Sequence, residues 1–246
     1  MSERKEKLNK HSGILVIAMD NYLLALLQLT DSQLPTGAFS HSYGLETYIQ
    51  EDQVTDAASF TAWLNMYVDE QLKYADGLVS RLVYEAIERD DIAEIWKLDR
   101  LITVQNLPRE VRQGSYKMGE RLVSLGLSLY EFPLLIEYKE RISTNQSFGH
   151  PAIVFTMIAY YLEVPKKSAI SSYLYSCVSG IVQNAVRGIP LGQTAGQRIL
   201  RDIQPQLLET AKETEKLKFD DFGITAPGIE ISQMKHERLT IRIFMS

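Results

Sequence analysis

Residues 168–201 read SAISSYLYSCVSGIVQNAVRGIPLGQTAGQRILR, a long uncharged segment that runs through a Gly/Pro break into a second, charged segment. Apolar residues recur at helical spacing along the first half, which predicts a helix with one broad face toward a core. This stripe consists of Ile170, Leu174, Val178, Ile181, Val182, Ala185 and Val186. The other positions are small, among them Ser172, Ser176, Ser179 and Gly180, so we expect a neighbouring helix to approach closely. The pattern indicates a central, packed helix.

A second helix is predicted after the break. Gly188 and Pro190 end the first helix, because glycine is poorly ordered in a helix and proline lacks an N–H group. Polar side chains gather at the junction and along the second helix, namely Arg187, Gln193, Gln197, Arg198 and Arg201. Two interpretations remain open: a surface that recognises another protein, or ordinary interhelical hydrogen bonding around a kink.

The rest of the chain favours an all-α fold. Its 246 residues, 45% of them hydrophobic, suffice for a large core, and no segment alternates apolar and polar residues for long. We expect a single-domain helical bundle with flexible N- and C-terminal segments. The expected boundaries are a disordered leader at 1–18 before a natural start at Met19, the domain at 19–222, and a C-terminal docking tail at 223–246. LLIEYK at 134–139 is the one strand-like segment before the tail, and residues 223–233 show no helical pattern.

Charge, cysteine content and hydropathy exclude several classes of protein. The formal net charge of −5 disfavours nucleic-acid binding, and the single cysteine, Cys177, fits a buried position in a reducing, cytoplasmic setting. GILVIAM at 13–19 is too short for a convincing signal peptide and lacks a cleavage site. The uncharged segment from 168 to 186 holds five serines and two amides, which makes it too polar for lipid. We therefore expect no membrane association.

The loop after residue 30 invites a catalytic interpretation. Asp31, Ser40 and His41 could form a nucleophilic triad, although sequence neighbours seldom point at one another and no G-x-S-x-G motif surrounds Ser40. Ser40 is also suited to cap a helix that begins in HSYGLETYIQ. There is no phosphate-binding loop, and the four histidines lack metal-ligand spacing, so we expect neither cofactor nor metal. His150, before Pro151, is expected to cap or pack a helix start.

Two longer motifs resemble a known family. LLQLTDSQLPTGAFSHSYGLET at 26–47 and NAVRGIPLGQTAGQRIL at 184–200 look like the N- and C-terminal signatures of the urease accessory protein F family. PREVRQGSYKMGERL at 108–122, GHPAIVF at 149–155 and MKHERLTIRIFMS at 234–246 also resemble it. The resemblance therefore covers nearly everything after Met19.

This resemblance implies an all-α, non-enzymatic urease maturation chaperone that forms dimers. Such a protein binds the accessory protein D or H and recruits the GTPase G, and the assembly delivers nickel to apo-urease. The 28–46 region and the tail are then candidates for the D/H contact, and residues 187–201 for the dimer and GTPase surface. The candidate partner-binding residues are Gln28, Asp31, Pro35, Gly37, Phe39, Ser40, His41, Tyr43, Glu46, Arg187, Gln193, Gln197, Arg198, Arg201, His236, Glu237, Arg242 and Phe244.

Two other functions remain alternatives. The first is a GTPase-activating or GTPase-gating regulator that inserts Arg187 or Arg198 as a charge stabiliser, because guanidinium groups suit phosphate. The second is a hydrolase with an unrecognised site, whose activity would survive without any partner.

Overall fold

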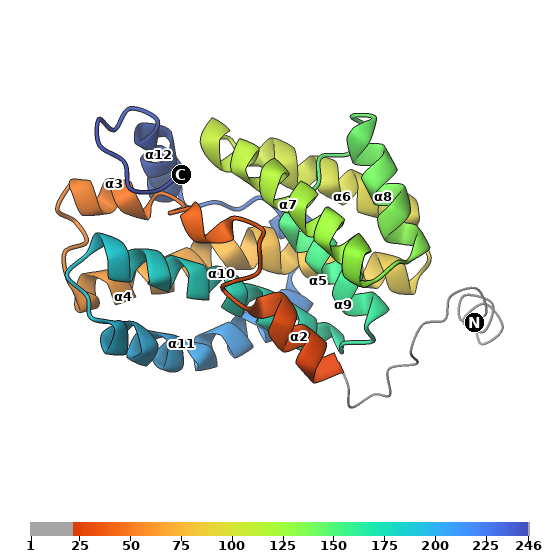
Figure 1. Cartoon of the computed structure of the whole chain (residues 1–246), viewed down its shortest axis with the longest axis horizontal. Coiled ribbons are helices and arrows are strands. Elements are labelled where there is room, and N and C mark those ends of the chain that lie inside the picture. Colours follow the sequence, from red (N-terminus) through yellow and green to blue (C-terminus); the bar gives the residue numbers. More distant parts are fainter. Residues whose placement is uncertain (1–21, 246) are drawn as a thin grey trace.

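The computed structural model describes residues 22–245, and this part of the chain is helical without a named strand, as the sequence predicts (Figure 1). The leader expected at 1–18 and the start expected at Met19 lie outside the described residues. The helices are α2 (Tyr22–Thr30), α3 (Leu45–Gln50), α4 (Ala57–Met66), η2 (Tyr67–Gly77), α5 (Leu78–Glu88), α6 (Ile92–Gln105), α7 (Arg109–Leu129), α8 (Pro133–Ser143), α9 (Pro151–Tyr161), α10 (Lys166–Gly188), α11 (Gln193–Glu213) and α12 (Pro227–His236), with short turns η1 (Ala38–Ser40), η3 (Thr214–Lys216) and η4 (Phe219–Asp221).

The long helix α10 lies between two apolar clusters. One cluster is built mainly from α5 to α9, and the other from α4, η2 and α11. Tyr173 belongs to the first cluster, whereas its neighbour Leu174 belongs to the second. All of the predicted stripe except Val186 is buried. The prediction of a central, packed helix is therefore confirmed.

The small residues of α10 do not have the expected role. A side chain added at Gly180 would meet no atom within 4 Å, so no neighbouring backbone approaches the helix there. Close packing of α10 occurs instead against Gly196 of α11, where an added Cβ would lie 2.8 Å from a methyl group of Val186. The small residues around Gly180 leave open space beside the helix rather than a tight helix contact.

Two segments are helical although their patterns did not predict it. The strand-like run 134–139 lies in α8, which starts at Pro133 and buries Leu135 and Tyr138, three residues apart. The helix α12 lies within the tail and packs beside α3 (Figure 1). Its buried positions are Ile229, Ser232, Gln233 and His236, which have helical spacing but are mostly polar. An inward face of this composition gives no apolar stripe, which is why hydropathy missed it.

One helical segment has unusual geometry. The chain passes from α4 into α5 through η2, an 11-residue π-helix at Tyr67–Gly77. Hydrogen bonds from residue i to i+5 are rare in proteins, usually span a single turn, and are frequent at functional sites. The wider turn of η2 changes which side chains share one face of the helix.

Candidate partner-binding site

The loop between α2 and α3, residues 31–44, depends on two left-handed glycines. Gly37 has φ 86° and precedes η1, and Gly44 has φ 90° and occupies the N-cap position of α3. The prediction that Ser40 caps this helix is wrong. Ser40 lies in η1 and donates its hydroxyl to the carbonyl of Gly37 over 2.8 Å. Glycine is favoured at positive φ because it has no Cβ to clash with the backbone.

The C-terminal residues pair with this loop. The N–H of Met245 donates to the carbonyl of Ser40, and the N–H of Ser42 donates to the carbonyl of Met245, both over 2.7 Å. These bonds form an isolated parallel bridge between the loop and the tail, from opposite ends of the chain. We call residues 36–46, 184–187 and 236–245 the loop–tail junction.

Two residues near the end of α10, Asn184 and Arg187, contact the loop and the tail. The side-chain amide of Asn184 donates to the carbonyl of His41 over 2.6 Å, and Arg187 donates to the carbonyl of Phe39 over 2.6 Å. Arg187 also bonds to the side-chain oxygen of Asn184, and its guanidinium carbon lies 5.0 Å from the ring centre of Phe244. Arg187, predicted as a partner residue, thus bonds to the loop and to its own helix.

The buried carboxylate of Glu46 binds the backbone of the C-terminal tail. Glu46 accepts from the N–H of Ile243 over 2.5 Å and from the N–H of Phe244 over 3.1 Å. Its second oxygen also lies 2.8 Å from Nε2 of His236. Glu46 is only 2% exposed and His236 is fully buried, as is most of Phe244. Because a buried carboxylate is unfavourable without such partners, these contacts lock the tail onto α3.

The other ring nitrogen of His236 faces a second carboxylate. Nδ1 lies 2.8 Å from Glu110, which also accepts from Arg242 over 2.6 Å. Burial alone would raise the pKa of Glu110, but the hydrogen bonds from His236 and Arg242 outweigh it and hold that pKa below its ordinary value. Ionised carboxylates only accept hydrogen bonds. The ring of His236 therefore lies between two carboxyl groups, with one nitrogen 2.8 Å from each.

Three apolar side chains of the junction are exposed. Ile241 and Ile243 expose 74% and 64% of their surface, and Phe39 exposes 54%. A second exposed apolar group lies on α2, the helix that leads into the loop, and consists of Leu23, Leu24 and Leu27. Gathered apolar side chains on a protein surface are typical of interaction sites.

Other predicted residues lie elsewhere or have a structural role. Gln193, Gln197, Arg198 and Arg201 are exposed on the first half of α11, and no hydrogen bond between described residues joins them to the junction. Gln28, Asp31 and Pro35 are exposed on α2 and the start of the loop. Glu237 forms a rim ion pair with Arg109 at 2.9 Å. Within residues 22–245, the α11 residues therefore share no hydrogen bond with the loop or the tail.

The catalytic interpretation of the loop fails on geometry. Ser40 donates to Gly37, and Asp31 is exposed and accepts from the backbone of Gln33 over 2.8 Å. His41 is buried against Gly114, where an added Cβ would lie 2.3 Å from the imidazole. A nucleophile must bond to its base, and the base to an acid, for this chemistry. Ser40 and Asp31 direct their bonds to the backbone instead.

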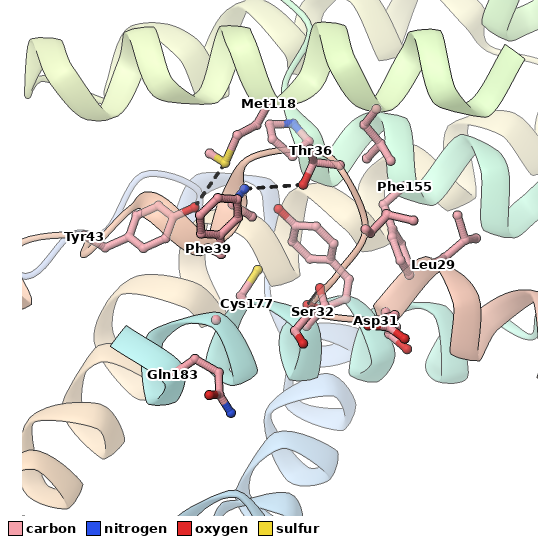
Figure 2. Close-up of a pocket in the computed structure, with 18 of the residues that line it drawn as sticks. Leu29, Asp31, Ser32, Thr36, Phe39, Tyr43, Met118, Phe155, Cys177 and Gln183 are labelled. Atoms are coloured by element: carbon pink, nitrogen blue, oxygen red, sulfur yellow. Dashed lines mark hydrogen bonds between the residues drawn. The ribbon is translucent and has the colours of Figure 1, made fainter. Parts of the chain in front are cut away.

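An outer pocket of about 280 Å³ lies beneath the loop (Figure 2). Its lining combines apolar Leu29, Phe155 and Met118 with polar Asp31 and Gln183, and it includes the open side of α10 at Gly180. Figure 2 shows the hydroxyl of Tyr43 directed at the sulfur of Met118, at 3.7 Å. The small residues of α10 therefore form one wall of a pocket.

Sequence reasoning missed Asn184 and Glu110 as parts of the site. Asn184 carried a weak signal, because it is a polar residue at a buried position of an otherwise apolar helix. Glu110 carried none, because its partners His236 and Arg242 are 126 and 132 residues away. His150 does cap α9 as expected, since its Nδ1 accepts from the N–H of Ala152.

The described residues contain neither a metal-ligand cluster nor a membrane-spanning helix. Within 22–245, no group of three or more His, Cys, Asp or Glu side chains is placed to hold a metal ion. No helix in that same range combines the length and apolar character that a bilayer span requires.

Comparison with known proteins gives a consistent result. The pattern of the family described as UreF matches residues 54–204. A protein of Lachnoclostridium phytofermentans named "Urease accessory protein UreF" is 54% identical over 228 residues, which cover 93% of this chain and 100% of that relative. A protein of the same name from Bacillus sp. is 49% identical over 226 residues, covering 92% and 100%.

Proposed function

The chain belongs to the UreF family of urease accessory proteins, and we propose that it acts in urease maturation as a non-enzymatic scaffold. It binds the D/H-type accessory protein and, as a homodimer in the cytoplasm, recruits the G-type GTPase for GTP-dependent nickel insertion into apo-urease. The accessory role is supported by the relatives' names. Each finer assignment is a proposal with its own test.

The observation that carries this proposal is the exposed apolar face of the loop–tail junction. Ile241, Ile243 and Phe39 face solvent, while the backbone beneath them is held by Glu46 and Arg187. A surface that is already ordered loses little conformational entropy when a partner docks on it. We therefore assign the D/H contact to this face, with residues 223–246 as the docking tail, and we include Gln28 and Asp31 at its edge.

The exposed side of α11 is the second proposed contact surface. Gln193, Gln197, Arg198 and Arg201 offer forked donors there, and the side chain of Arg201 is 71% exposed even though it pairs with Asp202. Within the described residues this face shares no hydrogen bond with the junction, and we propose that different proteins occupy the two surfaces. We assign it to the dimer and the GTPase.

Co-purification with the D/H-type protein of the same genome tests the first surface. The variant Ile241→Ser with Ile243→Ser removes apolar area without touching the buried hydrogen bonds of the tail. Ile136→Ser is the matched control, because it makes the same change on an exposed residue of α8, at the opposite end of the molecule from the C-terminus (Figure 1). We expect the wild type and the control to retain the partner and the double variant to lose it. Retention by all three would remove the assignment, and no complex with the intact chain would remove the scaffold function.

A role as regulator of the GTPase is the second candidate, and the structure favours Arg198 over Arg187 for it. Arg187 is engaged by Phe39 and Phe244, whereas Arg198 is exposed with no ion pair or hydrogen bond to any described residue. A free guanidinium can insert beside phosphate. GTP turnover by the assembled complex should fall with Arg198→Ala and partly recover with Arg198→Lys. Equal turnover in all three complexes would eliminate this candidate.

A further inference from the structure

An inner chamber of about 50 Å³ adjoins the outer pocket and is lined mainly by polar side chains. Tyr43, Tyr173 and Cys177 line both spaces, so these residues form the wall between them. An interior space with polar walls needs an occupant that can satisfy them, because unpaired polar groups in a protein interior are unfavourable. None of the exposed contact residues Phe39, Ile241 and Ile243 lines this chamber.

The π-helix η2 supplies the polar wall. Tyr67, Gln71 and Asp76 of η2 all line the chamber, at intervals of four and five residues. This spacing matches the i→i+5 hydrogen bonding of a π-helix, which places all three side chains on one face. In an α-helix, which has fewer residues per turn, one of the three would face a different side. The unusual geometry of η2 therefore serves to gather these groups on one face.

The chamber carries one negative charge. Asp76 is its only lining residue with a charge at neutral pH, because burial lowers the pKa of His150 and raises the pKa of Cys177, which keeps both groups neutral. The carboxylate accepts one hydrogen bond, from the hydroxyl of Tyr173 over 2.9 Å. No cationic side chain in residues 22–245 pairs with it. Asp76 is partly buried, and a cation close to such a carboxylate stabilises its charged form.

Two deeply buried groups on the chamber wall also lack partners. Tyr67 is 4% exposed, and its hydroxyl bonds to no residue in the described chain. His150 is 7% exposed and accepts from Ala152 at Nδ1, so its proton is on Nε2, where no described residue accepts it. The occupant must therefore offer positive charge to Asp76 and acceptor oxygens to His150.

We propose that the inner chamber binds a hydrated monovalent cation of the size of Na⁺, K⁺ or ammonium, with Asp76 as its counter-charge. One positive charge balances the one carboxylate, and the surrounding Tyr67 and Gln71 supply neutral oxygens of the kind that hard cations prefer. Water on the ion accepts the proton of His150. The volume suffices for the ion and a few waters, at about 10–15 Å³ each.

Thermal unfolding of the full chain in different chloride salts at equal ionic strength tests this site. Choline is too large for the chamber and serves as the reference cation. In the wild type we expect the most tightly bound of Na⁺, K⁺ and ammonium to raise Tm by about 3 °C relative to choline. A cation at a concentration of roughly ten times its Kd produces a shift of this size in a domain of this length. Comparison of the three salts identifies the preferred ion.

Two variants separate this site from general salt effects. Asp76→Asn should abolish the difference between the preferred ion and choline, while Glu70→Gln, the same change at an exposed position of η2, should keep it. Equal Tm values in all salts, or a difference that survives Asp76→Asn, would overturn the proposal. Crystals of the wild-type chain grown with Rb⁺ give a second measurement that needs no variant. An anomalous peak beside Asp76 is expected, and a chamber without one would contradict the site.

Discussion

Glu46→Gln tests the reasoning about the buried tail contacts most directly. The wild-type carboxylate accepts from the N–H groups of Ile243 and Phe244 and from His236, all within 3.1 Å. Glutamine has nearly the same shape, but one of its two oxygens becomes an NH₂ group. That group would point its hydrogens at the N–H donors of the tail, so at least one of these donors would lose its acceptor.

The expected loss of unfolding free energy is about 3 kcal/mol. Hydrogen bonds to charged groups contribute about 1.5–3 kcal/mol each, and removal of one partner from a buried ion pair costs about 3–5 kcal/mol. The tail can detach and hydrate its freed donors, which limits the loss to what docking of the tail contributes. Burial of Phe244 accounts for about 1.5–3 kcal/mol of that docking energy. The lower end of the range is therefore expected.

Urea denaturation at pH 7 measures this loss, and amide hydrogen exchange shows where it arises. Exchange at Ile243 and Phe244 should accelerate together with the drop in stability. Glu237→Gln is the control, because the Glu237 ion pair with Arg109 lies on the rim and should contribute less than about 1 kcal/mol. If Glu46→Gln unfolds within 1 kcal/mol of the wild type and exchange stays slow, the locking role of this carboxylate is refuted.

Four further substitutions test other features of the chain. The pKa of Glu110 is depressed in the folded protein, so its stabilising effect is complete above its unfolded pKa of about 4.3 and is lost as pH falls through the lower folded value. Glu110→Gln should therefore flatten the acid side of a Tm-versus-pH curve, and an unchanged curve would count against it. Gly180→Ala should add up to about 1 kcal/mol of stability in urea denaturation, because the new side chain meets open space. Gly119→Ala should remove about 3 kcal/mol, because its Cβ would lie 1.5 Å from the carbonyl oxygen of Gly149. Similar values for the two variants would contradict the packing described. Asp99→Ala leaves the buried hydroxyl of Tyr138 and the N–H of Phe148 without their acceptor, while the N–H of His150 keeps only the Tyr138 oxygen. The change should lower Tm by several degrees, and a Tm equal to the wild type would show that these bonds are replaced.

Much of the fold was predictable because helical periodicity is a local property. The apolar stripe of α10 was visible in residues 170–186, and the break at Gly188 and Pro190 matches its end at Gly188. The prediction failed at α12, where the inward face carries Ser232, Gln233 and His236. Hydropathy detects a buried face only when that face is apolar, and here hydrogen bonds to α3 and α7 stabilise polar groups instead.

The candidate site was only half predictable. The resemblance pointed to the loop, the end of α10 and the tail, and the structure brings these three segments together. It did not indicate which side chains face inward. Glu46, His236 and Phe244 were predicted as partner contacts, yet they are buried and position the tail, so the exposed residues Ile241 and Ile243 became the better candidates.

The sequence by itself determined the all-α class, the central helix and the family, since each of these depends on residue spacing or motifs within short stretches. Only the tertiary structure decided the loop–tail junction and the inner chamber. Glu46 and His236 are 190 residues apart, and their contact exists only because α3 and α12 pack side by side. The chamber likewise depends on the π-helical turn of η2 and on its packing against α10, since no local pattern reports a distance between side chains of separate helices.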